Sequence, residues 1–428
     1  MKTTLLFLSV FLTTALFGQN VYIPDATFKN YLVGNPNINT NGDTEIQVSE
    51  ANAYIYGIYI PSQQIYDVTG IEAFTSLTEF RIPFCNCTSI DLSQNTALEI
   101  LDINGNSLTN LDVSQNTLLE DFSCSGNELT SLDVSQNTAL EYLSCYGNQL
   151  TSLDVSQNIA LESLWCESNQ LTSLDVSQNT LLVELNCRGN QFTNLDVSQN
   201  TLLEVFVCDN NELTSLDVSQ NTLLEGLSCY GNQLTSLDVS QNTLLEGFAC
   251  DNNELTSLDV SQNTALLFLH CSNNQLSSLD LCNTPLVDLD CNDNQLTFLD
   301  LSTTTNFEEL NCWNNQLTGV NLANGNNITT SGMSIEFWGN PNLTCVQIDN
   351  LAWAIANINS AWDPQPNFSE DCNFTEGCFN ANLTELTTSK NLIQILDMMG
   401  RETPFKPNTP LIYVYDDGSI EKVFSVEY

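Results

Sequence analysis

The sequence has very little positive charge. Its 428 residues include 8 lysines and arginines against 52 aspartates and glutamates, which gives a formal net charge of −44. Between Arg81 and Lys390 the only basic residue is Arg188. Such a surface repels phosphate backbones, so we expect no nucleic-acid partner. It attracts divalent cations and basic or neutral polar ligands instead, although acidity also serves simply to keep a long repetitive chain soluble.

Long hydrophobic runs are missing after the first twenty residues. Lys2, the apolar residues 5–17 and Gly18 together predict a secretory signal peptide over residues 1–18. No later segment approaches 18 consecutive apolar residues. We therefore expect a secreted protein whose mature chain has no transmembrane segment.

Groups that carry out catalysis are also scarce. The single histidine, His270, has no carboxylate and nucleophile at a fixed spacing from it. Glycine-rich phosphate loops are missing from the sequence, and carboxylate pairs are too frequent to mark a site. We predict that the protein is not an enzyme.

What the sequence does contain is a repeat of 21 residues, with one step of 20. It is marked by ten cysteines: Cys124, Cys145, Cys166, Cys187, Cys208, Cys229, Cys250, Cys271, Cys291 and Cys312. The pattern Leu-x-x-Leu-x-Cys-x-x-Asn-x-Leu is the leucine-rich repeat signature with cysteine at its third apolar place. Such a period indicates a stack of similar coils, which offers a long binding surface and rarely a catalytic pocket.

The repeat predicts an α/β-type solenoid of mostly short parallel strands with turns and few helices. In each coil the alternating Leu and Cys side chains share the interior face of one short strand. Counted by the third apolar residue, from Ile60 to Phe337, the curved right-handed stack has about 14 coils and covers residues 55–344. The second half of each repeat, Leu-Asp-Val-Ser, is expected to form another short strand or an extended turn on the convex side.

Three columns of equivalent residues follow from this stacking. The cysteines are small apolar residues that point the same way, which suits disulfides poorly, so we predict free buried thiols. The asparagines equivalent to Asn148 are expected to bond backbone groups at the bend after each strand. The aspartates equivalent to Asp154 repel one another, and either turn capping by Ser and Thr donors or bound cations must offset that repulsion.

The repeats resemble those of the cysteine-ladder internalins, which also read Leu-x-Cys-x-x-Asn and Leu-Asp-Val-Ser. The resemblance covers roughly residues 98–317. Because those proteins are surface adhesins, it implies the same fold and a role in adhesion. The chain differs from them at its C-terminus, where it has no wall-anchoring signal of the Gram-positive kind.

Residues 19–54 are predicted to form an N-terminal cap. Apolar residues between Ile23 and Leu32 have the spacing of a short amphipathic helix. Residues 39–50 match an EF-hand-like loop, apart from Asn at position 1 and Thr44 at position 6. The expected calcium ligands are Asn39, Asn41, Asp43, Glu45 through its backbone carbonyl, and Glu50. The alternative is an ordinary polar loop.

Residues 345–372 are predicted to form a C-terminal cap. Cys345 and Cys372 lie off the 21-residue spacing in an exported chain, so we predict a disulfide between them. Cys378 could instead pair with either.

The tail, residues 390–428, follows a linker over residues 373–389 and has three β-like runs separated by Gly, Pro and Asp turns. It resembles the type IX secretion sorting domain of Gram-negative bacteria. The matching residues are Asp397, Gly400, Arg401, Glu402, Asp417, Gly418 and Lys422. The resemblance implies export by the type IX machinery, removal of the tail and attachment to the outer cell surface.

The outward positions that flank Leu and Cys vary from coil to coil, unlike the other columns. The expected ligand-binding residues there, on the concave sheet, are Tyr142, Tyr146, Trp165, Arg188, Tyr230, Phe268, His270 and Trp313. Aromatic residues among acids are typical of protein- or glycan-binding surfaces, so we predict a surface protein that binds such a ligand in adhesion. The alternative is a structural spacer that binds calcium through its acidic columns. In that case the outward residues vary by neutral drift on a solvated sheet.

Overall fold

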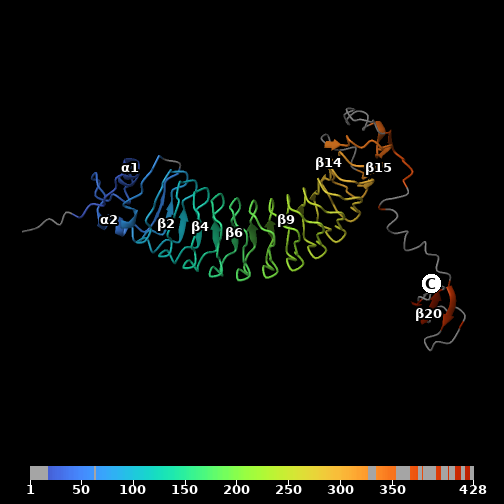
Figure 1. Cartoon of the computed structure of the whole chain (residues 1–428), viewed down its shortest axis with the longest axis horizontal. Coiled ribbons are helices and arrows are strands. Elements are labelled where there is room, and N and C mark those ends of the chain that lie inside the picture. The colour runs from blue at the N-terminus through green and yellow to red at the C-terminus, as the bar shows by residue number, and fades with distance from the viewer. Residues whose placement is uncertain are drawn as a thin grey trace, which may run out of the picture. The chain divides into compact units, whose positions relative to one another are not determined.

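The computed structural model describes residues 18–61, 64–325, 334–352, 367–374, 378, 392–396, 403, 410–415 and 420–424. The chain divides into two compact units, residues 1–370 and 371–428. In the first unit the coils follow one another in a row, each contributing one strand to a common sheet (Figure 1).

This main sheet has 14 parallel strands of three residues each. They are β1 (Gly57–Tyr59), β2 (Glu79–Arg81), β3 (Ile100–Asp102), β4 (Asp121–Ser123), β5 (Tyr142–Ser144), β6 (Ser163–Trp165), β7 (Glu184–Asn186), β8 (Val205–Val207), β9 (Gly226–Ser228), β10 (Gly247–Ala249), β11 (Phe268–His270), β12 (Asp288–Asp290), β14 (Glu309–Asn311) and β16 (Ser334–Glu336). The parallel solenoid of about 14 coils is thereby confirmed.

The strands pair in register, so equivalent residues of neighbouring coils lie side by side. Leu143, at the centre of β5, is opposite Leu164 of β6, and both are fully buried. The cysteine that follows each main-sheet strand from β4 to β14, such as Cys145, is buried in the same core, where the outer coils have isoleucine or phenylalanine. The interior of the stack is therefore a column of leucine or phenylalanine beside a column of cysteine.

The second half of the repeat forms strands only near the C-terminal end of the stack. Four strands make up this parallel sheet: β13 (Phe298–Asp300), β15 (Gly319–Asn321), β17 (Cys345–Gln347) and β18 (Asn367–Ser369). In the earlier coils the Leu-Asp-Val-Ser segment is not part of a sheet and ends in a turn at its serine. Residues 345–369, predicted as a cap, therefore include two strands that continue the stack.

Two helices lie before the first strand. Helix α1 (Ala26–Gly34) begins at Asp25, whose Oδ1 accepts hydrogen bonds from two backbone N–H groups of the first turn, and it buries Phe28 and Leu32. This is the helix that the apolar spacing predicts. Helix α2 (Val48–Ala53) was not predicted, and a short 3₁₀ helix, η1 (Ile71–Ala73), follows β1. In the described part of the chain no helix is long and apolar enough to cross a membrane.

Two columns of asparagine join the coils. The Nδ2 of Asn148 donates to the carbonyl oxygens of Cys145 at 3.0 Å and of Cys124, one coil earlier, at 3.1 Å. Its Oδ1 accepts from the N–H of Leu129 at 3.0 Å. A second buried column, which we did not predict, consists of the asparagines that follow the Leu-Asp-Val-Ser segments. There the Nδ2 of Asn137 donates to the carbonyl of Asn116 in the preceding coil at 2.8 Å.

The cysteines fall into two groups. Twelve are free and buried, namely Cys85, Cys87 and the ten on the repeat. The other four, Cys282, Cys345, Cys372 and Cys378, are disulfide-bonded. Free buried thiols on the repeat are as predicted, and Cys345 and Cys372 both belong to the disulfide-bonded group, while their pairing stays a prediction. Cys282 was not predicted to form a disulfide.

The second unit contains an antiparallel sheet. Its strands are β19 (Leu392–Leu396), β20 (Pro410–Tyr415) and β21 (Ile420–Phe424). They coincide with the three β-like runs of the sequence, and Lys422 is opposite Ile412 in this sheet. Other predicted elements lie outside the described residues: the signal segment 1–17, most of the linker 373–389, and the sorting-motif residues Asp397, Gly400, Arg401, Glu402, Asp417 and Gly418.

Candidate functional site

The side chains that point out of the main sheet form what we call the sheet face. Each coil contributes three residues to it: the first and third residues of the strand and the residue after the inward cysteine. Because the strands pair in register, these residues stand in three columns along the stack. Ligand-binding side chains on different coils can therefore lie side by side although they are 21 residues apart in sequence.

Two of the predicted residues form an aromatic pair on β5 and β6. The rings of Tyr142 and Trp165 meet edge to face, with centroids 5.8 Å apart and an interplanar angle of 67°. Both are half-buried, and the Nε1 of Trp165 is buried with no hydrogen-bond partner. Tyr146, after the same strand as Tyr142, is exposed.

A trough crosses the strands β8 to β11. It has a volume of about 260 Å³ and is lined by Val205, Val207, Gly226, Gly247, Ala249, Phe268 and His270, with Leu227, Ser228 and Phe248. Most of these groups are apolar. Val205 and Phe268, at its two ends, are 39% and 47% exposed. A hollow with exposed apolar walls is the part of the sheet face that is best suited to hold a side chain of a partner.

Glycine at successive coils creates the trough. Gly226 and Gly247 occupy the first strand position of β9 and β10, where neighbouring coils have Val205 and Phe268. Neither glycine has the positive φ that would require glycine. A Cβ at Gly226 would meet only methyl groups of Val205 at 3.9 and 4.0 Å, and at Gly247 it would meet nothing within 4 Å.

Acidic residues border the trough on both sides. Glu204, Glu225 and Glu246 each precede a strand of the trough and are exposed. On the opposite side Asp209 accepts hydrogen bonds from the hydroxyl of Ser228 and from the N–H of Tyr230 at 3.0 Å. Burial raises the pKa of Asp209. The two hydrogen bonds act in the opposite direction but do not outweigh burial, so the pKa lies above its usual value.

His270 and Arg188 are the basic groups of this region. The Nε2 of His270 lies 3.3 Å from Oδ2 of Asp288 on the next strand, and the imidazole is 45% exposed. Arg188, which follows β7, is exposed one coil before the trough begins. His270 thus belongs to the end wall of the trough, whereas Arg188 stands outside it.

The last predicted aromatic residue is far along the stack. Trp313 stacks on Trp338, with ring centroids 4.4 Å apart and an interplanar angle of 6°. Trp338 follows β16 and is 42% exposed. The eight predicted residues therefore do not form one site. Tyr142, Tyr146 and Trp165 lie at β5–β6, Arg188 follows β7, Phe268 and His270 line the trough with Tyr230 at its edge, and Trp313 lies at the C-terminal end of the sheet.

The predicted calcium ligands lie together in a loop whose polar groups bond one another. The carboxylate of Glu50 accepts from the N–H groups of Thr40 and Asn41 and from that of Gln47, which makes it part of the capping box of α2. Burial raises the pKa of Glu50, but these hydrogen bonds outweigh it and the pKa is lowered. The carboxylate is thus stabilised as an anion by the chain's own donors.

The other loop residues are engaged in the same way. Asn41 and Gln47 donate from their amide nitrogens to Oδ2 of Asp43 at 3.1 and 3.0 Å. Asn39 donates to the carbonyl of Asp43 at 2.8 Å, and the side chain of Glu45 pairs with Lys29 at 2.7 Å. Calcium needs oxygen ligands, so the amides of Asn41 and Gln47 would have to turn over to present their oxygens.

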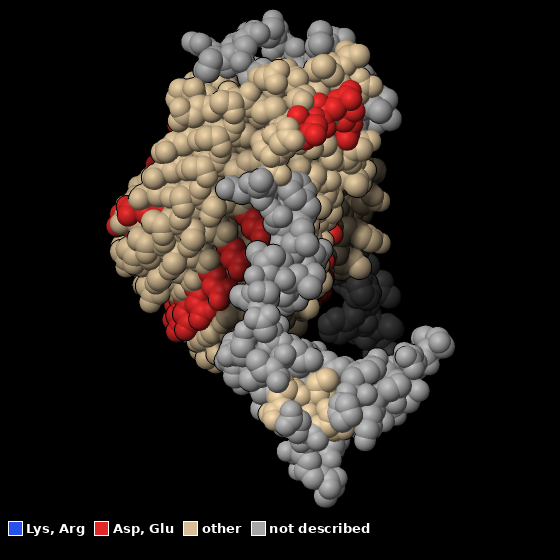
Figure 2. Space-filling view, turned by 90° about the vertical axis from the view of Figure 1, so that its right-hand side faces the viewer, with Lys and Arg blue, Asp and Glu red and all other residues tan. Residues whose placement is uncertain are grey.

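Acidic side chains are also concentrated away from the sheet face. Figure 2 shows acidic side chains gathered in several patches on one side of the molecule, with no lysine or arginine visible among the described residues of this view. In the aspartate column, Oδ1 of Asp154 accepts the N–H of Ser156 at 2.9 Å, and this hydrogen bond and that of the Ser156 side chain lower the pKa of Asp154. Turn capping, one of the two expected roles of the column, is therefore what these aspartates do.

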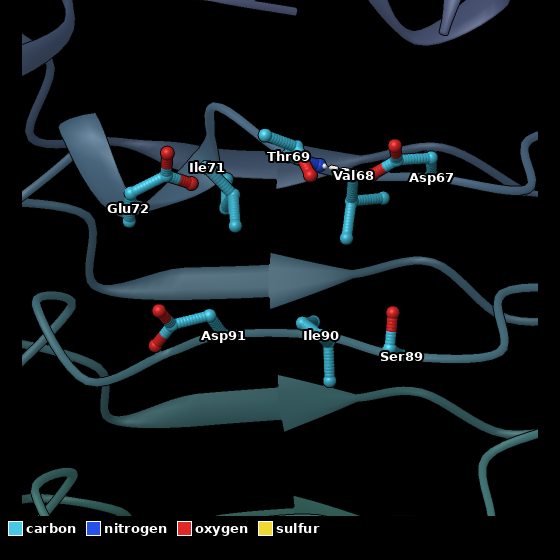
Figure 3. A pocket seen from close by; sticks show the side chains of 8 residues that line it. All are labelled: Asp67, Val68, Thr69, Ile71, Glu72, Ser89, Ile90 and Asp91. Atoms are coloured by element: carbon cyan, nitrogen blue, oxygen red, sulfur yellow. Dashed lines mark hydrogen bonds between the residues drawn. The ribbon is translucent and has the colours of Figure 1, made fainter. Parts of the chain in front are cut away.

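A second hollow lies between the first two coils, near Asp67, Glu72 and Asp91 (Figure 3). Each of these carboxylates accepts a backbone N–H within its own turn: that of Thr69 at 2.8 Å, Gly70 at 2.7 Å and Ser93 at 2.9 Å respectively. They are turn caps. Among the described residues no three His, Cys, Asp or Glu side chains are grouped as metal ligands would be.

Comparison with known proteins agrees with this geometry. No protein-family model and no curated protein matches the chain. Among solved structures, the functional domain of internalin J (InlJ) from Listeria monocytogenes, which includes a cysteine ladder, is 28% identical, with a TM-score of 0.68 over 96% of this chain and 98% of its own. The protein has a leucine-rich repeat fold.

Two other solved structures share this leucine-rich repeat fold. A leucine-rich repeat protein of Leptospira interrogans is 20% identical, with a TM-score of 0.61 over 75% of this chain and 97% of its own. An internalin of Listeria monocytogenes, InlF, is 20% identical, with a TM-score of 0.56 over 85% of this chain and 100% of its own. The cysteine ladder is the feature that this leucine-rich repeat protein has in common with internalin J.

Several residues of the leucine-rich repeat sheet face were not predicted as functional. These are Val205, Gly226, Gly247 and Ala249 of the trough, and Trp338 of the stacked pair. The trough does have a signal in the sequence. Aligned by their cysteines, the coils from Cys145 to Cys312 have glycine at the first strand position only at these two successive repeats.

Proposed function

We propose that this chain is a secreted or cell-surface protein that binds another protein through its sheet face, in adhesion. The trough across β8 to β11 is the observation that carries the proposal. Its apolar lining, with Val205 and Phe268 exposed at its ends, resembles the pockets that receive anchor residues at protein interfaces. An apolar floor favours a protein partner over a glycan, whose hydroxyl groups need polar partners.

The likeness to internalin J supports the surface location, and the resemblance of the tail to a sorting domain supports export by the type IX machinery with attachment to the outer cell surface. Calcium binding by the loop of residues 39–50 stays a prediction. The proposed activity is binding, and it includes no catalytic step. The twelve free cysteines, which could have been nucleophiles, are buried in the core.

The alternative is a structural spacer that has no specific ligand. The aspartate column supports it only weakly, because its carboxylates are already bonded within their turns. A spacer also gives no reason for two glycines that open a hollow in an otherwise regular sheet.

Arrays of purified proteins and of glycans, probed with the full labelled chain, test the proposal. We expect a small set of proteins to bind, with affinity falling about thirtyfold for Phe268→Ala, the loss typical of an interface anchor. Asp217→Ala, in the exposed aspartate column, is the control and should bind as the wild type does. Equal loss for both variants, or no binding at all, would favour the spacer. Binding to glycans alone would contradict the proposed protein ligand.

A further inference from the structure

We propose that the trough over β8 to β11 receives one bulky apolar side chain from a partner protein segment that carries lysine or arginine on both sides of that residue. The inference rests on the proposed protein-binding function and specifies the partner's chemistry.

The absence of side chains at Gly226 and Gly247 has no structural cause. Glycine within a strand destabilises it by roughly 0.5–1 kcal/mol relative to alanine, because it loses more freedom on folding. Both positions have an ordinary extended backbone and room for a Cβ. Alanine would therefore suit the sheet better, and what the glycines provide is the hollow itself.

The size of the hollow limits what it holds. Its volume of about 260 Å³ is below the range of about 300–1,000 Å³ that is usual for small-molecule sites. It is open on the sheet face and closed at its ends by Val205 and Phe268, with His270 beside Phe268. One leucine, isoleucine or aromatic side chain of a longer segment is an occupant of suitable size.

The borders specify the charge of that segment. Glu204, Glu225 and Glu246 stand exposed in a row along one side. Asp209 and Asp251 lie along the other, buried and hydrogen-bonded to serine hydroxyls. Residues 204–272 contain no lysine or arginine, and Arg188, one coil before the trough, interacts with Asp209 at its first coil. Opposite charge across an interface steers the partner and selects against acidic competitors, so cationic residues should flank the apolar anchor.

Selection from a phage-displayed library of random short peptides on the immobilised full chain tests this. Peptides that bind the wild type but not Gly226→Val/Gly247→Val should contain one bulky apolar residue next to lysine or arginine. For a synthetic peptide of that kind, fluorescence anisotropy should show affinity about thirtyfold lower for the double-valine variant. Glu204→Gln/Glu225→Gln/Glu246→Gln should weaken binding at low salt and reduce its dependence on salt.

The controls separate filling of the trough from loss of folding. Ser163→Val makes a similar change at the same strand position of β6 and should bind as the wild type does. The double-valine variant should unfold at a temperature no lower than the wild type, since valine favours strands. Selected peptides that are acidic, lack an apolar residue or bind the double-valine variant equally would overturn the inference, as would failure to enrich any peptide.

One result would separate the inference from the proposed function. If array proteins lose binding with Trp165→Ala but keep it with Gly226→Val/Gly247→Val, the sheet face binds protein and the trough is not where it does so. If only oligosaccharides bind, and the double-valine variant releases them, both proposals fail in their present form.

Discussion

Trp313 and Trp338, which follow the last two strands of the main sheet, stack face to face with ring centroids 4.4 Å apart. The sequence predicts Trp313 as a ligand-binding residue, and that stays a prediction. Because the two indoles cover one another, we expect Trp313 to contribute to stability as well. The pair holds the final coil, whose strand β16 is the edge of the sheet.

The stacked pair leads to the first prediction. Trp313→Ala should lower the free energy of unfolding, since aromatic pairs contribute about 0.5–1.5 kcal/mol beyond the area that they bury. Trp338→Ala should have a comparable effect. In a double-mutant cycle followed by urea unfolding, the two losses should not add, because each single change already removes the stack. Strictly additive losses would show that the rings contribute independently.

The second prediction concerns the ladder thiols. Burial raises the pKa of Cys145 to about 12, and it raises the pKa of the neighbouring thiols in the same way. Because the thiolate is the reactive form, an aromatic disulfide reagent should label the native chain very slowly. In denaturant twelve thiols should react, and sixteen after reduction. Rapid labelling of most thiols in the native chain would contradict this.

The third prediction concerns pH. Burial raises the pKa of Asp209 above its unfolded value, so its contribution to stability is full below the unfolded pKa and is lost as pH rises through the folded pKa. Asn at this position cannot ionise, and its Oδ1 can still accept from Ser228 and Tyr230. Asp209→Asn should therefore raise the urea midpoint at neutral pH.

The gain from Asp209→Asn should shrink on acidification toward about pH 4, where an ordinary aspartate is already half protonated. Asp217→Asn is the matched control. Hydrogen bonds from Ser219 lower the pKa of Asp217, so its contribution is present above the unfolded pKa and lost as pH falls. That variant should be less stable than the wild type at neutral pH, so the same sign for both variants would contradict the assignment.

The fourth prediction concerns calcium. If the loop of residues 39–50 binds the ion, millimolar calcium should raise the melting temperature relative to chelator, by mass action on the folded state. Asp43→Asn should remove that shift while keeping acceptors for its neighbours. Glu50→Ala is a poorer test, because it also removes the capping box of α2. An unchanged melting temperature in calcium would indicate that residues 39–50 form an ordinary polar loop.

Much of the fold could be predicted because each coil contacts only its neighbours. The spacing from Cys124 to Cys312 fixes the strands, the inward columns and the number of coils, and helix α1 follows from local apolar spacing. The disulfide-bonded state of Cys282 could not be predicted, since this residue replaces a serine of the repeat and a disulfide partner is distant in sequence. Trp338 was missed because the last coil has Phe337 in place of the cysteine by which the outward positions were aligned.

The candidate site was predicted only in part, for a different reason. Aromatic and charged residues such as Phe268 and His270 attract attention in a sequence, whereas Gly226 and Gly247 act through what they lack. A hollow exists only in relation to the side chains around it, and those come from coils before and after. The hydrogen bonds of the cap loop could not be predicted for a similar reason. Gln47 and Thr40, which donate to Asp43 and Glu50, are not ligand positions of the calcium-binding pattern.

Because the strands pair in register, each added repeat lengthens the sheet by one fixed strand spacing. Gain or loss of one repeat between β6 and β8 would leave every coil with the same kind of neighbours. It would move the Tyr142–Trp165 pair relative to the trough by one strand spacing, about 4.8 Å, without altering either. Copying or deleting a repeat thus gives a route by which such a protein adjusts the distance between two contact points while the residues at each stay the same.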